Sequence, residues 1–81
     1  MRAKFNQRKK KTLEYFATRG WTYAPRAAVD LGVYPTRAEA SYLLRLHRWG
    51  LLYRARDRRG RVIYRLSPRG ARWLLRRVGR V

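Results

Sequence analysis

Arginines are the residues of this 81-residue chain whose type and spacing could do chemistry. Arg37, Arg45 and Arg48 recur with Ser41 at intervals of three and four residues, which places them on one side of a helix. A guanidinium stays charged and donates paired hydrogen bonds, so it suits phosphate oxygens and the O6 and N7 atoms of guanine. The spacing therefore predicts a helix face that presents donors to an anionic partner.

A second group of arginines crowds a short, turn-like segment. It consists of Arg56, Arg58, Arg59 and Arg61. Surface turns usually mix charge signs, so this group indicates contacts with phosphates or with a narrow minor groove, whose negative potential attracts arginine.

A third basic group, Lys9, Lys10 and Lys11, lies near the start of the chain. It allows two interpretations, an arm that holds phosphate or a solubilising segment, and residues 1–6 are predicted to be a flexible basic arm.

The overall charge narrows the partner classes. The chain has 22 Lys and Arg against 4 Asp and Glu, a formal net charge of +18, which requires a polyanion to explain it. No apolar run approaches the ~18 residues of a membrane span, and the basic start argues against a secretory leader. We therefore expect a cytoplasmic, nucleoid-associated protein that does not bind membranes. The length and the 46% apolar content predict a single domain over residues 1–81.

Catalytic and metal chemistry find little support. The chain has no cysteine and one histidine, His47, and its four acids fall in four different predicted elements. This pattern offers neither a carboxylate pair nor a metal-ligand cluster, and no glycine-rich phosphate loop is present. The sequence predicts a non-enzyme with no catalytic residue, metal or cofactor.

Capping and periodicity predict the elements that position the arginines. We expect a helix over 7–19 capped by Asn6, a short strand at 21–23, and a helix from Pro25 closed by Gly32. A third helix over 36–49 begins with Thr36-Arg37-Ala38-Glu39, the pattern of a capping box. The large aromatics Trp21, Tyr23 and Trp49 are interpreted as core or core-rim residues.

The third helix is predicted to be amphipathic. Its apolar face consists of Ala40, Leu43 and Leu46, bordered by Glu39 and His47. Its exposed face consists of Arg37, Ser41, Arg45 and Arg48, flanked by Ala38 and Tyr42. Leu44 fits neither face.

A β-hairpin and a last helix complete the expected elements. Residues 51–56 and 61–66 alternate in polarity around a turn, and Ser67-Pro68 opens a helix that runs to about Arg77. The buried stripe of this helix is expected to consist of Ala71, Leu74, Leu75 and Val78. Trp73 points away from the stripe, which indicates a surface for a homodimer.

Several segments together resemble a known family. The chain is similar to a winged helix-turn-helix in four segments. These are Ala28 followed by Gly32, the leucines around Gly50 (Leu43, Leu46, Leu51 and Leu52), a charged hairpin with Gly60, and Tyr64-Arg65-Leu66-Ser67-Pro68 followed by Gly70. Over roughly 13–75 the chain resembles the MarR- and PadR-like bacterial and archaeal transcriptional regulators.

The resemblance implies an α+β fold: a three-helix core, a β-hairpin wing and a C-terminal helix. It implies a sequence-specific regulator that binds double-stranded DNA, with the third helix in the major groove and the wing on the backbone or minor groove. The contacts carried over by position are Arg37, Ser41, Tyr42 and Arg45 on the helix, and Arg56, Arg58, Arg59 and Arg61 on the wing. The length leaves no room for both long dimerisation helices and an effector pocket, so no small-molecule effector is expected.

Two alternatives remain open on the sequence alone. One is a winged helix that grips RNA or the ribosome, since arginine also suits an RNA backbone. The other is a protein-interaction module that uses the last helix and Trp73.

Overall fold

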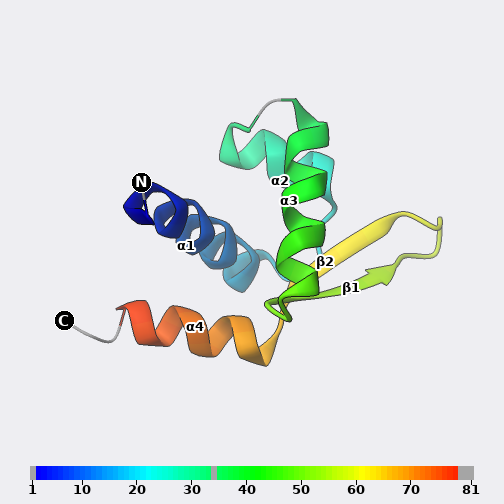
Figure 1. Ribbon diagram of the computed structural model, residues 1–81. Helices are drawn as coiled ribbons and strands as arrows, with labels where there is room; N and C mark the ends of the chain where they lie inside the picture. Colours follow the sequence, from blue (N-terminus) through cyan, green and yellow to red (C-terminus); the bar gives the residue numbers. More distant parts are fainter. Residues whose placement is uncertain (1, 34, 79–81) are drawn as a thin grey trace.

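The computed structural model describes the backbone of residues 2–33 and 35–78 and the side chains of residues 7–33 and 35–76. The elements are α1 (Arg2–Arg19), α2 (Ala24–Leu31), α3 (Thr36–Arg48), β1 (Leu52–Arg56), β2 (Val62–Leu66) and α4 (Pro68–Val78). Within these ranges the chain is a small α+β protein with four helices and one antiparallel hairpin (Figure 1). The predicted order of the four helices and the hairpin is confirmed.

Local signals in the sequence explain several of the element ends. Gly32 takes a left-handed conformation, with φ of 70°, and closes α2. Ser67 caps α4, because its Oγ accepts a 3.0 Å hydrogen bond from the Gly70 N–H. The same hydroxyl donates to the Gly50 carbonyl at 2.6 Å, which fixes the start of α4 beside the end of α3.

The starts of α1 and α3 differ from the prediction. The first helix begins at Arg2, so residues 2–6 are helical rather than a flexible arm and Asn6 lies inside the helix instead of capping it. The predicted capping box is also wrong. Pro35 occupies the N-cap of α3 without a side-chain hydrogen bond, and Thr36 is already the first helical residue. Glu39 is therefore not needed at the cap, and its side chain turns into the core.

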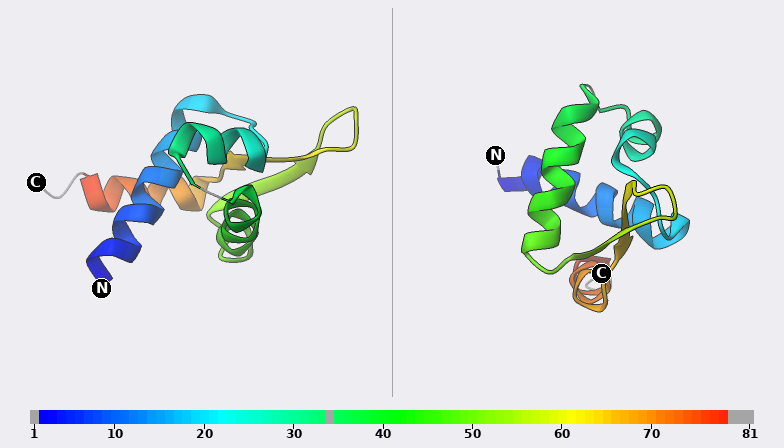
Figure 2. Two further views of the ribbon diagram at one scale, coloured as in Figure 1. Left: turned by 90° about the horizontal axis from the view of Figure 1, so that it is seen from above. Right: turned by 90° about the vertical axis from the view of Figure 1, so that its right-hand side faces the viewer.

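The core forms where α1, α2 and α3 meet the hairpin. Its most deeply buried apolar side chains are Leu13, Phe16, Ala27, Ala28, Leu43, Leu46 and Leu52. The helix α1 packs against α4, and the hairpin projects away from the helices (Figure 2). The hairpin tip and the far end of α4 therefore lie at opposite ends of a molecule whose longest dimension is 42 Å.

The hairpin register determines which strand residues face the helices. Arg54 is paired with Tyr64 and Arg56 with Val62, so these four side chains share the face of the buried Tyr64. The predicted strand at 21–23 is reduced to one bridge, in which Thr22 and Tyr64 exchange backbone hydrogen bonds of 3.0 and 2.9 Å.

The aromatic and α4 predictions need correction. Trp21 is 43% exposed and Trp49 is 41% exposed, so neither is a core residue. On α4 only Leu74 of the predicted stripe is buried, whereas Leu75 is 69% exposed. Trp73 packs partly buried against the core instead of pointing outward. The side chain of Val78 lies outside the described residues.

Candidate nucleic-acid interface

The arginine face of α3 is exposed. Arg37, Ser41, Arg45 and Arg48 all have solvent-exposed side chains, as their spacing predicts. The opposite face is buried and consists of Glu39, Tyr42, Leu43 and Leu46. Two side chains therefore exchange roles relative to the prediction. Tyr42, expected to flank the exposed face, is 5% exposed, and Ala40, expected in the core, faces solvent.

A cluster with α1 explains why Tyr42 and Glu39 turn inward. The Arg8 guanidinium lies 3.9 Å above the centre of the Tyr42 ring, and its Nη2 lies 3.5 Å from Glu39 Oε1. Burial raises the pKa of the Glu39 carboxyl, and the neighbouring Arg8 opposes that rise. Burial likewise raises the pKa of the Tyr42 hydroxyl. Tyr42 therefore joins α1 to α3, and we leave it out of the candidate interface.

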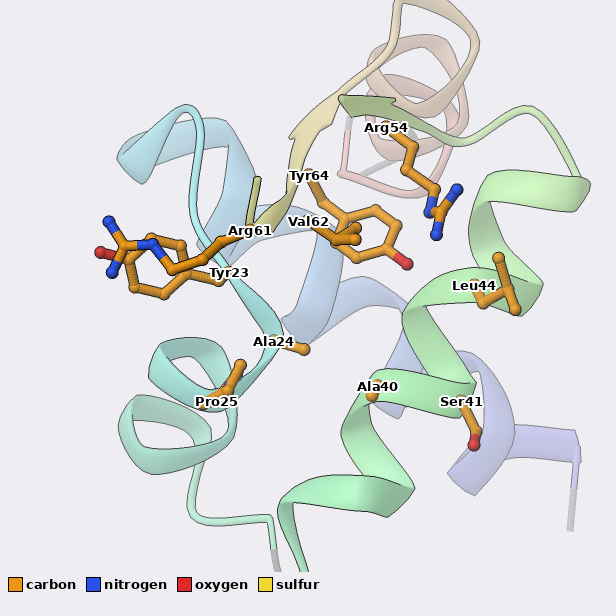
Figure 3. Close-up of a pocket in the computed structure, with 10 residues that line it drawn as sticks. All are labelled: Tyr23, Ala24, Pro25, Ala40, Ser41, Leu44, Arg54, Arg61, Val62 and Tyr64. Carbon is orange, nitrogen blue, oxygen red and sulfur yellow. The ribbon is translucent and has the colours of Figure 1, made fainter. Parts of the chain in front are cut away.

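A groove of about 710 Å³ opens between α3, the start of α2 and the hairpin. Its lining is mainly apolar and consists of Tyr23, Ala24, Pro25, Ala40, Ser41, Leu44, Arg54, Arg61, Val62 and Tyr64. In Figure 3, Ser41 and Leu44 lie on α3 across this space from the strand residues Arg54 and Tyr64. We call this space the α3–hairpin groove. It places Ser41, from the arginine face of α3, on the same groove as the hairpin residues Arg54 and Arg61.

Of the lining residues the sequence singled out only Ser41 and Arg61 as site residues, and Ala40, Leu44 and Arg54 are among those it missed. A signal for Arg54 was present, since it lies two residues after the buried Leu52 and so shares its face of the strand. No comparable signal places Leu44, because its half-buried position depends on how closely the hairpin approaches α3.

The hairpin turn is organised by one carboxylate. Asp57 Oδ1 accepts hydrogen bonds of 2.9 Å from the backbone N–H groups of Arg59 and Arg61, and its Oδ2 accepts another of 2.9 Å from Arg61 Nε. These bonds, led by the one from the Arg61 backbone, hold the pKa of Asp57 below its usual value.

The four hairpin arginines consequently fall into two pairs. Arg56 Nη1 donates to the Gly60 carbonyl at 2.9 Å, and the Arg61 guanidinium lies 4.5 Å from the centre of the Tyr23 ring. Both side chains therefore help to hold the hairpin. Arg58 and Arg59 lie at the tip with exposed side chains, and among the described residues no ion pair involves them.

The three lysines lie on α1 rather than on an arm. Lys9 is half-buried, with its Nζ 4.9 Å from the ring centre of Trp49 and 5.1 Å from that of Trp73. This side chain therefore links α1 to α4 and to the residue that follows α3. Lys10 is half-buried and Lys11 is exposed, so of the three Lys11 is the most accessible to a phosphate.

Geometry and charge carry the functional argument for this chain. Comparison with models of protein families, with curated proteins and with solved structures finds no match. Over the described ranges, no group of three or more potential metal ligands gathers in one place. None of the helices described is long and apolar enough to span a membrane.

Proposed function

We propose that the protein is a winged helix-turn-helix domain that binds double-stranded DNA sequence-specifically, as a transcriptional regulator. In this proposal α3 enters the major groove, and the hairpin acts as the wing on the adjacent backbone or minor groove. The observation that carries it is the α3–hairpin groove, which is lined by Ser41 of α3 and by Arg54 and Arg61 of the hairpin. Arg37 and Arg48 are exposed on the same helix.

The arginine face of α3 has hydrogen-bond donors of the kind that bind base edges. A helix of 13 residues is about 20 Å long, and a B-DNA major groove about 12 Å wide admits it. Arg37 and Arg48 can donate paired hydrogen bonds to guanine, and Ser41 can donate or accept. Ala40 and Leu44 add small apolar contacts of the kind that recognise the thymine methyl group.

The hairpin tip supplies a second, less specific set of contacts. Arg58 and Arg59 extend beyond a turn that Asp57 holds in shape, so the tip is basic and conformationally restricted. Such arginines suit phosphates or a narrow minor groove. In this role the wing fixes the orientation of α3 on the duplex.

A DNA duplex suits this arrangement better than an RNA duplex. The major groove of A-form RNA is deep and narrow, so side chains on a helix such as α3 cannot read it. An exposed helix with short side chains between its arginines is compatible with the wider groove of B-DNA.

Fluorescence anisotropy with a labelled DNA duplex tests the proposal. We expect the logarithm of the affinity to fall linearly with the logarithm of salt concentration, at about −0.9 per phosphate neutralised. We expect Arg37→Ala combined with Arg48→Ala to weaken binding at least about tenfold, since each lost bidentate contact contributes about 1–3 kcal/mol.

The matched control is Arg19→Ala combined with Arg26→Ala, which removes the same charge from two arginines paired with Asp30. We expect this control to lose much less affinity. Structured RNA that competes better than duplex DNA at equal salt would contradict the proposal, as would a flat salt response.

A further inference from the structure

A second basic surface lies on α4, outside the α3–hairpin groove. Arg69, Arg72 and Arg76 follow one another at intervals of three and four residues and are all exposed. With Leu51 and Trp73 they line a hollow of about 420 Å³. We call these three residues the α4 arginine row. None of the residues that line its hollow lines the α3–hairpin groove.

Among the described residues, no acidic side chain forms an ion pair with the α4 arginine row. All four acids of the chain are described, and the ion pairs that they form with described residues involve Arg8, Arg19, Arg26 and Arg61. The row therefore carries three positive charges that no described ion pair balances. Bringing such charges together opposes folding, so an external anion would relieve a cost that the fold leaves in place.

The row is held rigidly against the end of α3. A Cβ added at Gly70 would lie 2.2 Å from the Leu51 carbonyl oxygen, so the first turn of α4 lies directly on that backbone. The Ser67 N–H also donates to the Leu51 carbonyl at 3.1 Å. The side chain of Arg69 crosses Gly50, because a Cβ there would lie 3.2 Å from Arg69 Cδ. The arginines are therefore presented on a fixed support.

The row has the length and the chemistry for a nucleic-acid backbone. Arg76 lies seven positions after Arg69 on the helix, a rise of about 10 Å, which matches the axial rise of about three phosphates of one DNA strand. The described side chains of the hollow include guanidinium groups and an indole but no amide or hydroxyl. Such a lining suits phosphates in general and offers little with which to distinguish bases.

We propose that the α4 arginine row binds the backbone of a second DNA duplex, so that one molecule bridges two duplexes. This inference rests on the proposed function, because the first duplex is the one held at α3 and the hairpin. The hairpin projects from one end of the molecule and α4 runs to the other (Figures 1 and 2). The row therefore leads away from the hairpin tip, and its hollow shares no lining residue with the α3–hairpin groove.

A capture experiment tests the bridge. A short duplex is fixed to beads and saturated with the protein, and a second, labelled duplex is then added. We expect the wild-type protein to retain the labelled duplex. We expect R69Q/R72Q/R76Q to retain less than about a fifth as much, because the row holds the backbone of the second duplex. Its affinity for one short duplex should change less than about threefold, because the first duplex is held at α3 and the hairpin.

Two further variants make the result specific. R19Q/R26Q/R65Q removes the same charge from other exposed arginines and should retain the second duplex like the wild type. R69K/R72K/R76K keeps the charge and should restore most of the capture, since lysine also binds phosphate. If two copies of the protein instead met at α4, the glutamine variant should capture more of the second duplex than the lysine variant, because neutral glutamines repel one another less than charged side chains do.

Each outcome is decisive. Capture by the wild type that the glutamine variant loses supports the bridge. Capture that survives in the glutamine variant, or binding of the first duplex without capture of the second, overturns the bridge but leaves the proposed function standing. Failure to bind even the first duplex contradicts the proposed function, and the bridge with it.

Discussion

The α3–hairpin groove and the α4 arginine row carry the same kind of charge but have different neighbours. In the groove the arginines border a floor of small and apolar side chains, such as Ala40 and Leu44, and Asp57 shapes the adjacent turn. In the row they surround only Leu51 and Trp73, with no acid among them. Under the proposed function, net charge indicates only that the partner is a polyanion, whereas shape and mixed chemistry would distinguish a surface that reads bases from one that contacts only the backbone.

The position of the α4 arginine row depends on how α4 is attached to Leu51, and Gly70→Ala should have the largest effect on stability. The added Cβ would meet the Leu51 carbonyl at 2.2 Å and Leu66 Cδ1 at 2.8 Å, so the first turn of α4 must move. We expect a loss of about 3 kcal/mol in the free energy of unfolding, measured by urea denaturation.

Gly60→Ala is the matched control for Gly70→Ala. Gly60 has a left-handed φ of 80° but no atom within 4 Å of an added Cβ, so only backbone strain of about 1 kcal/mol is expected. Equal destabilisation by the two substitutions would show that the close approach of α4 to Leu51 is not as described.

A second test sharpens the claim that the α3 face reads bases. At about 100° per residue, Arg37 lies between Ser41 and Leu44 on the groove side of α3, and Arg45 lies toward the other side. We expect Arg37→Ala to lose about 1–3 kcal/mol of discrimination at one base pair, measured with single-substitution duplexes. Arg45→Ala should weaken all of these duplexes by a similar factor. Identical specificity profiles for the two variants would contradict the assignment.

The salt dependence separates the two surfaces by the number of phosphates that each engages. R58Q/R59Q removes both tip arginines of the hairpin and should make the log–log salt slope on one short duplex less steep by up to about 1.8. The α4 variant R69Q/R72Q/R76Q should leave that slope almost unchanged. A larger change of slope in the α4 variant than in the hairpin variant would show that the first duplex binds at α4.

The smallest expected effect concerns the buried carboxyl that supports α3. Because burial raises the pKa of Glu39 in the folded state, its contribution to stability is fully present below the unfolded pKa and is lost as the pH rises through the folded pKa. Glu39→Gln cannot ionise. The free energy of unfolding of Glu39→Gln, relative to that of the wild type, should therefore increase as the pH rises from about 4 to 7. A difference between the two proteins that does not vary with pH would show that Arg8 fully offsets the burial.

The sequence predicted the elements and the exposed side of α3 well, because these depend on local chemistry. Ser67 caps α4 through its own hydroxyl, and Gly32 ends α2 through its left-handed backbone. The exposed positions Arg37 and Ser41 follow from helical periodicity alone. Asp57 organises the predicted turn, which begins where it was expected and ends one residue later.

Side chains whose positions depend on distant partners could not be predicted. Glu39 and Tyr42 are buried because Arg8, 31 residues before Glu39, approaches both of them. Trp73 packs inward, with the α1 residue Lys9 over its ring, and Leu75 is left exposed. In each case the side of the helix that is buried depends on a long-range contact that periodicity does not contain.

The most direct test of the central claim is selection of bound fragments from random duplex DNA by the wild-type protein and by Arg37→Ala. Base readout by α3 predicts that the wild type enriches a defined motif, and that the variant still binds but loses its preference at one or two positions of that motif. Firm binding by the wild type with no enriched motif would contradict base readout. It would show that the α3–hairpin groove contacts only the DNA backbone.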